Sequence, residues 1–179
     1  MFSLRRIFLY QRPMIEFLQV LSSKGVQNFM NELFATIQKF FTDDEWYYMQ
    51  LGNQPILQMT FQGKNGKWTC YAQVHEEQPI FFFFSVCPVN VPEEKRPVLS
   101  EFITRANYGL KVGNFEMDFS DGEIRYKTSI NVENDSLSGA IIRNLVYANL
   151  WTMDRYLTGI LSVIYGDVTP VEALQKSEE

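Results

Sequence analysis

The spacing of apolar residues predicts three helices. Through residues 26–41, apolar side chains recur every three or four positions, which is the pattern of a helix with one buried face. Similar stripes run through residues 93–107 and residues 137–165. Gly109 follows the second stripe, where we expect it to end the helix in a left-handed conformation. From Pro170 we expect a short final helix and then a frayed, acidic end.

Extended segments fill the rest of the chain, four before the second helix and two before the third. Residues 46–51, 56–62 and 80–87 are apolar and bounded by turn residues. Asn65-Gly66 and Asp121-Gly122 each favour a two-residue hairpin turn. The order α-ββββ-α-ββ-α indicates an α+β domain, with an antiparallel sheet of about six strands flanked by helices.

Both turns predict a strand register that the alternation of side chains supports. Around the first turn, the apolar cross-strand pairs are Phe61–Cys70, Met59–Ala72 and Leu57–Val74. Around the second turn, they are Phe119–Ile124, Met117–Tyr126 and Phe115–Thr128. The other face of the second hairpin would pair Asp118 with Arg125 and Glu116 with Lys127. We therefore expect two hairpins that each turn one face to the core.

Four consecutive phenylalanines make the fourth strand apolar on both faces. Successive side chains of a strand point to opposite sides, so Phe81 and Phe83 share one face and Phe82 and Phe84 share the other. Either the strand is central and covered on both sides, or one pair of rings forms an exposed patch that binds a partner or a second subunit. The sequence leaves both interpretations open. The candidate partner or dimer surface comprises Phe81, Phe82, Phe83, Phe84, Trp46 and Tyr48.

Composition and charge narrow the class of protein. Of the 179 residues, 46% are hydrophobic and 15% aromatic, which suits one globular domain with an aromatic-rich core or interface. A formal net charge of -5 repels phosphate backbones and argues against nucleic-acid binding. Cys70 and Cys87 lie in apolar strands and form no CxxC pair. We expect two buried free thiols in a reducing, cytoplasmic compartment.

The N-terminal residues lack the marks of a membrane segment. No run of the chain approaches the roughly 20 apolar residues of a transmembrane helix, so we expect no membrane partner. Arg5 and Arg6 precede a short apolar run that residues 11–13 interrupt, which is too short for a secretory signal. We interpret these first residues as a tail without a function of its own, or as sequence that precedes a true start at Met14.

The chain is thus expected to divide into three parts. Residues 1–25 form an N-terminal extension with a short helix, residues 26–165 form the α+β domain, and residues 166–179 form a C-terminal tail. Within the last long helix, Asp154-Arg155 is interpreted as structural. It forms either a local ion pair or a contact with the sheet edge.

No reactive side chains form a recognisable catalytic or metal-binding set. His75 is the only histidine, and on a strand it points away from Cys70, so the two do not share a metal. Glu76-Glu77 lies in a turn, and Glu93-Glu94 lies in the first turn of a helix, where it favours the helix dipole. Gly63–Lys67 joins two strands, which is the context of a hairpin tip and not of a phosphate loop. We expect no enzyme and no cofactor.

Two stretches carry a resemblance to a known bacterial family. The first is Asn107-Tyr108-Gly109-Leu110, Gly113-Asn114-Phe115-Glu116 and the run from Asp121 to Ser129; the second is Ala148-Asn149 with Met153-Asp154-Arg155-Tyr156-Leu157. In these residues the chain resembles the YbjN family, over about residues 26–165. The resemblance implies a fold similar to type III secretion chaperones, often dimeric, and the label of a sensory transduction regulator. It brings no catalytic residues.

The aromatic sheet, the lack of a catalytic set and this resemblance favour a non-enzymatic protein-binding module. It would be chaperone-like or regulatory, act as a homodimer, and hold a partner polypeptide on its sheet or in a groove between helix and sheet. The alternative is a small-molecule sensor. Such a sensor would need a pocket between the last helix and the sheet, lined by residues such as Tyr156 and Phe102.

Overall fold

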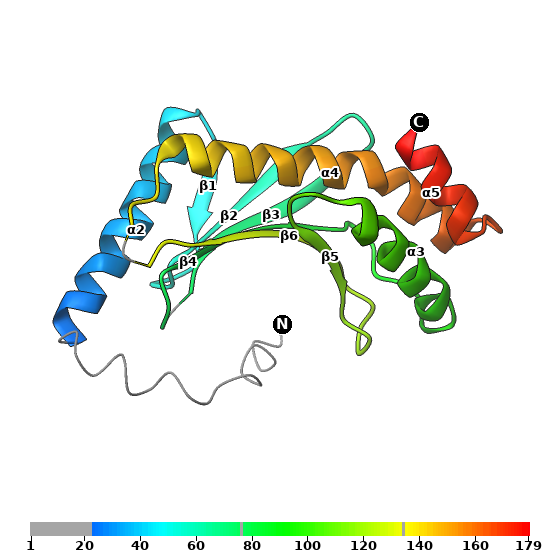
Figure 1. Ribbon diagram of the computed structural model, residues 1–179, viewed down its shortest axis with the longest axis horizontal. Coiled ribbons are helices and arrows are strands. Elements are labelled where there is room, and N and C mark those ends of the chain that lie inside the picture. The colour runs from blue at the N-terminus through cyan, green and yellow to red at the C-terminus, as the bar shows by residue number, and fades with distance from the viewer. Residues whose placement is uncertain (1–22, 76, 134) are drawn as a thin grey trace.

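The computed structural model describes residues 23–75, 77–133 and 135–179, which form a six-stranded antiparallel sheet with its helices on one side (Figure 1). The helices are α2 (Ser23–Asp43), α3 (Arg96–Gly109), α4 (Gly139–Tyr165) and α5 (Pro170–Glu178), and the 3-10 turn η2 (Glu93–Lys95) leads into α3. The strands are β1 (Tyr48–Gln50), β2 (Ile56–Gln62), β3 (Lys67–Val74), β4 (Ile80–Val86), β5 (Asn114–Met117) and β6 (Ile124–Asn131). The predicted class, strand number and element order are confirmed, and α5 follows as the short final helix predicted from Pro170.

The sheet has the strand order β1-β2-β3-β4-β6-β5. Strands that follow one another in the sequence pair as hairpins, except for β4 and β5. Instead β4 pairs with β6, and β5 lies at the edge of the sheet. The long helix α4 crosses the covered face above β4 and β6 (Figure 1). The two strands that pair without being consecutive in the sequence, β4 and β6, therefore lie beneath the longest helix.

The core lies between this face of the sheet and the helices. The strands turn alternate side chains into it, among them Leu57, Cys70, Phe83 and Tyr126, all of them fully buried. The buried stripe of α4 meets them with Ile142, Val146, Leu150, Met153, Leu157 and Ile160. The amphipathic helix predicted over residues 26–41 is α2, which buries Met30, Leu33, Ile37, Phe40 and Phe41. The predicted short helix near residues 14–21 lies outside the described residues.

The tip of the β2–β3 hairpin lies one residue earlier than predicted. The Gly63 amide donates to the Gly66 carbonyl over 2.8 Å, so Lys64 and Asn65 form the two-residue tip. Neither has the positive φ that an Asn-Gly turn of the mirror-image type requires. The observed pairs are Phe61–Trp68, Met59–Cys70 and Leu57–Ala72. The predicted register is wrong by two residues, although each side chain keeps its face because a shift of two preserves alternation.

Contacts with α4 explain where this hairpin turns. The Asp154 carboxylate accepts hydrogen bonds from the backbone amides of Lys64 (3.1 Å) and Asn65 (2.8 Å). A β-carbon on Gly63 would lie 2.3 Å from the Asp154 carboxylate, and one on Gly66 would lie 2.6 Å from a leucine side chain of α4. The two glycines therefore permit the close approach of the tip to the helix. Asp154 makes the contact with the sheet that was one of its two predicted structural roles.

The β5–β6 hairpin also turns through a different loop. The Asp118 amide donates to the Glu123 carbonyl (2.9 Å), so residues 119–122 form a four-residue loop in which Gly122 has a φ of 80°. The observed pairs are Phe115–Tyr126, Glu116–Arg125 and Met117–Ile124, again displaced by two residues from the prediction. Phe119 was expected on the core face and is instead 56% exposed in this loop.

Hydrogen bonds from outside the hairpin fix the conformation of this four-residue loop. The Val91 amide donates to the Gly122 carbonyl (2.8 Å), and the Arg96 guanidinium donates to the Phe119 carbonyl (2.8 Å). Val91 lies in the connection between β4 and α3, and Arg96 is the first residue of α3. The local Asp-Gly pattern does not depend on such distant partners. For this reason the turn predicted from it was wrong.

The end of α3 and the C-terminus differ from expectation. Gly109 is the last residue of α3, but the glycine with the left-handed backbone is Gly113, with a φ of 78°. The final helix predicted from Pro170 is confirmed. The end that was expected to fray is helical as far as Glu178. α5 packs against α3 and α4, with Ala173 fully buried and Ser177 only 5% exposed.

Arg155 and Tyr156 of α4 fix α5 in place. The Arg155 guanidinium donates to the carbonyls of Ser177 and Glu178, each over 2.7 Å. The Tyr156 hydroxyl donates to the Glu178 carboxylate over 2.9 Å. These three hydrogen bonds hold α5 against α4.

Replacing Asp154 by alanine should destabilise the protein by about 1–3 kcal/mol, because two backbone amides lose a charged acceptor. The measurement is the free energy of unfolding by chemical denaturation. Asp43→Ala is the matched control, since Asp43 forms an exposed i,i+4 ion pair with Lys39 and should change stability by less than about 0.5 kcal/mol. Equal effects of the two substitutions would contradict the role assigned to Asp154.

Candidate functional site

The face of the sheet that turns away from the helices carries an apolar strip. On β4 this open face presents Ile80, Phe82, Phe84 and Val86, while the alternate residues point into the core. Phe82 and Phe84 stack with 5.7 Å between ring centroids. Phe82, Ile80 and Val86 are only half-buried, and no described helix lies on this side of the sheet (Figure 1).

Strand pairing extends the open face across the whole sheet. One row of opposed residues runs over all six strands: Met49, Gln58, Tyr71, Phe84, Lys127 and Asn114. The two rings of this row lie on adjacent central strands. The face is therefore apolar in its centre, polar on the β2 side and charged on the β6 side.

The charged side of the open face is built by three residues. Glu116 on β5 forms an ion pair with Arg125 (2.8 Å) and another with Lys127, both on β6. The pairing of Glu116 with Lys127 was predicted, whereas Arg125 was expected to pair with Asp118. The Arg125 guanidinium lies 4.7 Å from the centroid of the Phe84 ring, which buries that ring to 8% exposure.

Electrostatics keep Glu116 ionised on this face. Its burial alone would raise its pKa, but hydrogen bonds and charge from Lys127 and Arg125 outweigh burial and lower the pKa below its ordinary value. Two cations share one carboxylate, so the three side chains together carry one positive charge.

The β5 edge of the sheet is closed by a side chain of α3. The Asn107 Oδ1 accepts from the Phe115 amide (2.7 Å), and the Asn107 Nδ2 donates to the Phe115 carbonyl (3.0 Å). One side-chain amide thus satisfies both outward backbone groups of Phe115, as a neighbouring strand would. An edge protected in this way is a poor site for the addition of another strand.

The six residues predicted to form a partner or dimer surface lie on two opposite faces of the sheet. Phe81 and Phe83 are fully buried in the core, so they cannot contact a partner in this structure. Phe82 and Phe84 lie together on the open face. Trp46 and Tyr48 lie on the opposite, helix-covered side, because Tyr48 pairs with the inward-facing Met59. The structure therefore brings two of the six together on the open face, and their role in binding stays a prediction.

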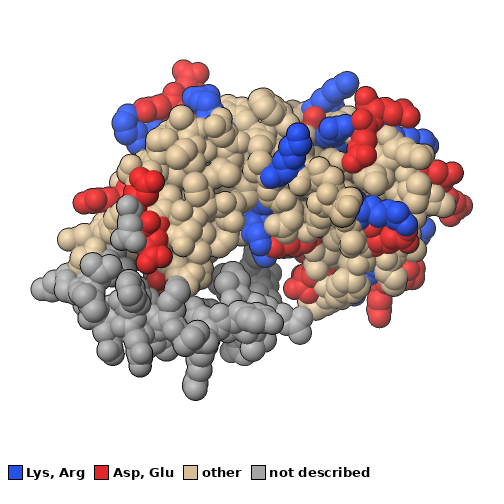
Figure 2. Space-filling view, in the orientation of Figure 1, with Lys and Arg blue, Asp and Glu red and all other residues tan. Residues whose placement is uncertain are grey.

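Trp46 belongs to a second group of aromatic side chains, which we call the helix-side aromatic group: Trp46, Tyr147 and Trp151. The Trp46 indole and the Tyr147 hydroxyl both donate to the Asp44 carboxylate, over 3.0 and 2.8 Å. Trp151 lies 5.7 Å from the Tyr147 ring and is 68% exposed. The surface over the middle of α4 is largely uncharged, whereas charged side chains gather over α3 and α5 (Figure 2).

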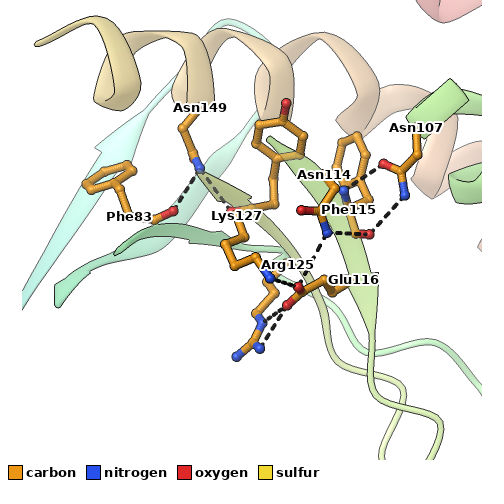
Figure 3. A network of polar contacts seen from close by, with 9 residues as sticks. Phe83, Asn107, Asn114, Phe115, Glu116, Arg125, Lys127 and Asn149 are labelled. Atoms are coloured by element: carbon orange, nitrogen blue, oxygen red, sulfur yellow. Dashed lines mark hydrogen bonds and ion pairs between the residues drawn. The ribbon is translucent and has the colours of Figure 1, made fainter. Parts of the chain in front are cut away.

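A buried asparagine connects the long helix to the sheet. Asn149 of α4 is fully buried, and its Nδ2 donates to the carbonyls of Phe83 on β4 and Tyr126 on β6, each over 3.0 Å (Figure 3). Its Oδ1 has no hydrogen-bond partner among the described residues. Burying an amide group costs free energy unless its hydrogen bonds are made. The two bonds of the Asn149 Nδ2 therefore fix the position of α4 on these two strands.

Sequence reasoning assigned no role to Asn149, Asn107 or Tyr71. The available signal for Asn149 was its position within an apolar stripe, three residues after Val146 and four before Met153. A polar residue at such a buried position requires a partner. Asn107 gave no comparable signal, because the strand edge that it protects is distant in the fold.

The other side chains considered for chemistry have structural environments. Cys70 and Cys87 are buried free thiols, as predicted, and burial raises their pKa values to about 12 and about 11. His75 accepts a hydrogen bond from the Glu77 amide at its Nδ1 (3.1 Å) next to the β3–β4 turn. Glu93-Glu94 lies in η2, directly before α3.

An open groove of about 550 Å³ lies between α2 and the start of α4. Its lining includes Phe40, Lys39, Arg143 and Asn144. The pocket expected for a small-molecule sensor would lie between the last long helix and the sheet. At that position Tyr156 and the Phe102 ring are buried against each other, with 6.4 Å between their centroids, so they form part of the core.

In the described part of the chain, no group of three His, Cys, Asp or Glu side chains is arranged to hold a metal ion. None of the described helices is both long enough and apolar enough to span a membrane.

One family model matches this chain. The family is described as "YbjN: Putative bacterial sensory transduction regulator", and the match covers residues 34–162, well over half of the chain. The resemblance predicted from the sequence is thereby confirmed. Among curated proteins, none matches the chain at a significant level.

Three solved structures are similar to this chain. YbjN from E. coli is 10% identical, with 65% of this chain and 84% of that chain covered and a TM-score of 0.49. The Yersinia pestis type III secretion chaperone SycH, in complex with a fragment of YscM2, is 14% identical (63% and 89% covered, TM-score 0.42). A chain of the HopA1–SchA chaperone–effector complex is 15% identical (70% and 94% covered, TM-score 0.47). Type III secretion chaperones are thus among the similar structures, as predicted, but at these TM-scores the likeness carries no inference about function.

The ion pairs of Glu116 predict a specific dependence of stability on pH. A carboxylate whose pKa is lowered by folding stabilises the protein above its unfolded pKa, and this contribution is lost as the pH falls through the folded pKa. Glu116→Gln should therefore cost about 1 kcal/mol at pH 7, and the difference from wild type should shrink between about pH 5 and pH 3. Denaturant unfolding at a series of pH values measures this difference.

The matched control is Glu101→Gln, which removes an exposed i,i+4 ion pair with Arg105. Its effect should stay below about 0.5 kcal/mol at every pH. A Glu116→Gln difference that does not change with pH would contradict the lowered pKa.

Proposed function

Because the chain belongs to the YbjN family, we propose that it is a non-enzymatic regulatory module that binds a protein partner on the open face of its sheet. The description of the family names regulation and no reaction. The observation that carries the proposal is the apolar strip of β4, which stays half-buried on a face without helices. Apolar patches of this kind on folded proteins mark interaction surfaces.

The chemistry of the open face favours a particular kind of partner segment. Phe82 and Tyr71 offer flat apolar surface at the centre, so the partner supplies apolar side chains there. Arg125 and Lys127 share the single carboxylate of Glu116, so an acidic residue beside those apolar side chains adds a favourable charge contact. We therefore propose an apolar partner segment with an acidic flank.

The binding mode follows from the protected edge. Since Asn107 occupies the backbone groups of Phe115, we propose that the partner lies across the open face and does not add a strand to β5. Side-chain contacts on the face, and not backbone pairing, then determine affinity. A substitution in the centre of the face should be more damaging than one at its rim.

We also propose that the chain forms a homodimer and acts in the cytoplasm. The helix-side aromatic group supports a second contact surface, because Trp151 is 68% exposed and lies beside the Tyr147 ring. Tryptophan is enriched among residues that dominate protein interfaces. The two buried free thiols are typical of a protein from a reducing compartment.

Phe82→Glu should abolish most of the binding to a partner segment. The experiment selects binders from a phage-displayed library of random peptides with the wild-type chain and then measures their affinities by fluorescence anisotropy. Selected peptides should combine apolar and acidic residues, and Phe82→Glu should weaken their binding at least tenfold, because a buried charge then faces the apolar anchor. Light scattering of the same wild-type sample should give twice the 21.0 kDa mass of one chain.

Tyr108→Glu is the matched control, since Tyr108 is 96% exposed on α3, away from the open face. It should leave peptide affinity unchanged, and the circular dichroism spectra of both variants should match the wild type. Equal peptide affinities of Phe82→Glu and wild type would overturn the proposed site. A mass of 21 kDa in solution would overturn the dimer alone.

A further inference from the structure

We propose that Phe84 is a second aromatic anchor for the partner, which Arg125 covers in the free protein and uncovers when a carboxylate of the partner takes its guanidinium. The partner then places an apolar side chain on the Phe84 ring and an acidic residue beside it. This inference rests on the proposed function, because it assumes that the partner uses the open face. The cover itself is argued from contacts within the chain.

Arg125 reaches the Phe84 ring from the neighbouring strand. On the sheet, Arg125 of β6 stands opposite Val86 of β4, whereas Phe84 stands opposite Lys127. The Arg125 side chain therefore leans diagonally along the open face, where its guanidinium lies 4.7 Å from the centroid of the Phe84 ring. Phe84 is only 8% exposed, whereas Phe82, which stacks on it, is half-buried. We attribute the deeper burial of Phe84 to this guanidinium.

Glu116 holds the guanidinium in this position. Its Oε2 accepts from the Arg125 Nε over 2.9 Å and lies 2.8 Å from the Nη2, so one carboxylate oxygen engages one edge of the guanidinium. Its Oε1 pairs with Lys127 and accepts from the Asn114 Nδ2 over 3.3 Å. Figure 3 shows these side chains together on the side of the sheet away from α4. The Arg125 side chain is still 34% exposed, so a partner on the open face can reach it.

The charges of this group leave room for one more carboxylate. Arg125 and Lys127 contribute two positive charges, and Glu116 contributes one negative charge. When a carboxylate of the partner takes Arg125, Glu116 keeps Lys127, and each cation then has a carboxylate of its own. A guanidinium matches a carboxylate with two parallel hydrogen bonds, so the new pair replaces the contact that Arg125 gives up.

The exchange is favourable because it makes an aromatic ring available to the partner. A cation–π contact and a partly exposed ion pair are each weak compared with the burial of a whole ring against apolar side chains. Once Arg125 has moved, Phe84 and Phe82 form one platform, since their rings stack with 17° between their planes.

The cover makes the site selective for one kind of partner. A partner that supplies both a carboxylate and an apolar side chain replaces the two contacts that Arg125 loses, with Glu116 and with the Phe84 ring. A neutral partner replaces only the second of them. The site therefore favours segments in which an acidic and an apolar residue lie close together.

The first test measures the exposure of the ring without any partner. The full chain carries 4-fluorophenylalanine in place of Phe84, and its fluorine resonance is compared in H₂O and D₂O, because this solvent isotope shift grows with the exposure of the ring. Arg125→Ala should raise the isotope shift about threefold, since it removes the cover. Glu116→Gln should give about half of that increase or more, because an amide holds a guanidinium less tightly than a carboxylate does.

Glu123→Gln is the matched control for the loss of a carboxylate. Glu123 lies directly before β6, close enough for the charge of Arg125 to act on its pKa, but the ion pair of Arg125 in the described part of the chain is with Glu116. The control should leave the isotope shift unchanged. An unchanged shift in Arg125→Ala, or equal shifts in Glu116→Gln and Glu123→Gln, would overturn the cover.

The second test asks whether the carboxylate of a partner removes the cover. Each peptide selected on the open face is compared with a version in which its acidic residues are replaced by their amides, and affinities are measured by fluorescence anisotropy. The wild-type chain should bind the acidic version about fivefold more tightly. Arg125→Ala should bind the amide version about threefold more tightly than the wild type does, because its ring is uncovered before the peptide arrives.

The double variant Arg125→Ala and Phe84→Ala should lose this gain, and the circular dichroism spectra of both variants should match the wild type. If Arg125 acted through its charge alone, Arg125→Ala would lose affinity for the acidic peptides and gain none for their amides. That result, or a gain that persists without the Phe84 ring, would overturn the second anchor.

The isotope shift needs no partner, so the cover and the partner site can fail separately. An uncovered ring in Arg125→Ala and Glu116→Gln, in a chain that selects no peptide, would support the cover and overturn the partner site together with the second anchor. Peptide binding that depends on Phe82, combined with an isotope shift that no substitution changes, would support the partner site and overturn the cover.

Discussion

The Asn149 side chain joins the longest helix to the two strands that no hairpin connects. Its amide group donates to one carbonyl of β4 and one of β6, in a place where water has no access. A buried amide group without its hydrogen-bond partners costs about 1–3 kcal/mol, so these bonds restrict where α4 can lie. The other polar side chains of α4 then reach their own partners. Asp154 holds the β2–β3 tip, Arg155 holds α5, and Arg143 and Tyr147 hold Asp44 before β1.

These contacts have one consequence for the shape of the domain. The described helices pack against one side of the sheet, and within the described residues the other side is covered only by its own side chains. On that side Phe84 is shielded by Arg125, which is itself held by Glu116, but Phe82 remains half-buried. A charged residue can cover an adjacent ring with the face of its guanidinium, but it cannot exclude water from the whole strip. The apolar surface that is left over is therefore a product of the same packing that makes the core.

The functional account follows from this asymmetry and from the closed edge. A sheet can bind a polypeptide by its edge or by its face, and Asn107 blocks the β5 edge with a side chain that acts as a strand. On the open face the Glu116 carboxylate is engaged by two cations, which lower its pKa. An apolar strip with charged side chains beside it is the kind of surface on which the proposed recognition rests. This agrees with the membership of a family that is described by regulation.

The sequence predicted the elements better than the contacts between them. Alternation identified which residues of β2, β3 and β6 point inward, because burial of one face is encoded by every second residue. It could not determine the turns, since Lys64 and Asn65 are placed by Asp154, a partner that is 89 or 90 residues away. The Phe81–Phe84 run showed the same limit. Its period assigned the pairs of rings correctly, but only the packing of α4 decides that Phe81 and Phe83 are the buried pair. Trp46 and Tyr48 were grouped with these rings by composition, although β1 turns them to the helix side.

The role of Asn149 can be measured most directly by native-state hydrogen exchange. Asn149→Ala removes both bridging hydrogen bonds, whereas Asn144→Ala removes an exposed amide from the same helix. If α4 is anchored through Asn149, the amides of β4 and β6 should exchange about 30-fold faster in Asn149→Ala, which corresponds to about 2 kcal/mol, and should be unchanged in Asn144→Ala. Unchanged protection of β4 and β6 in Asn149→Ala would contradict the account.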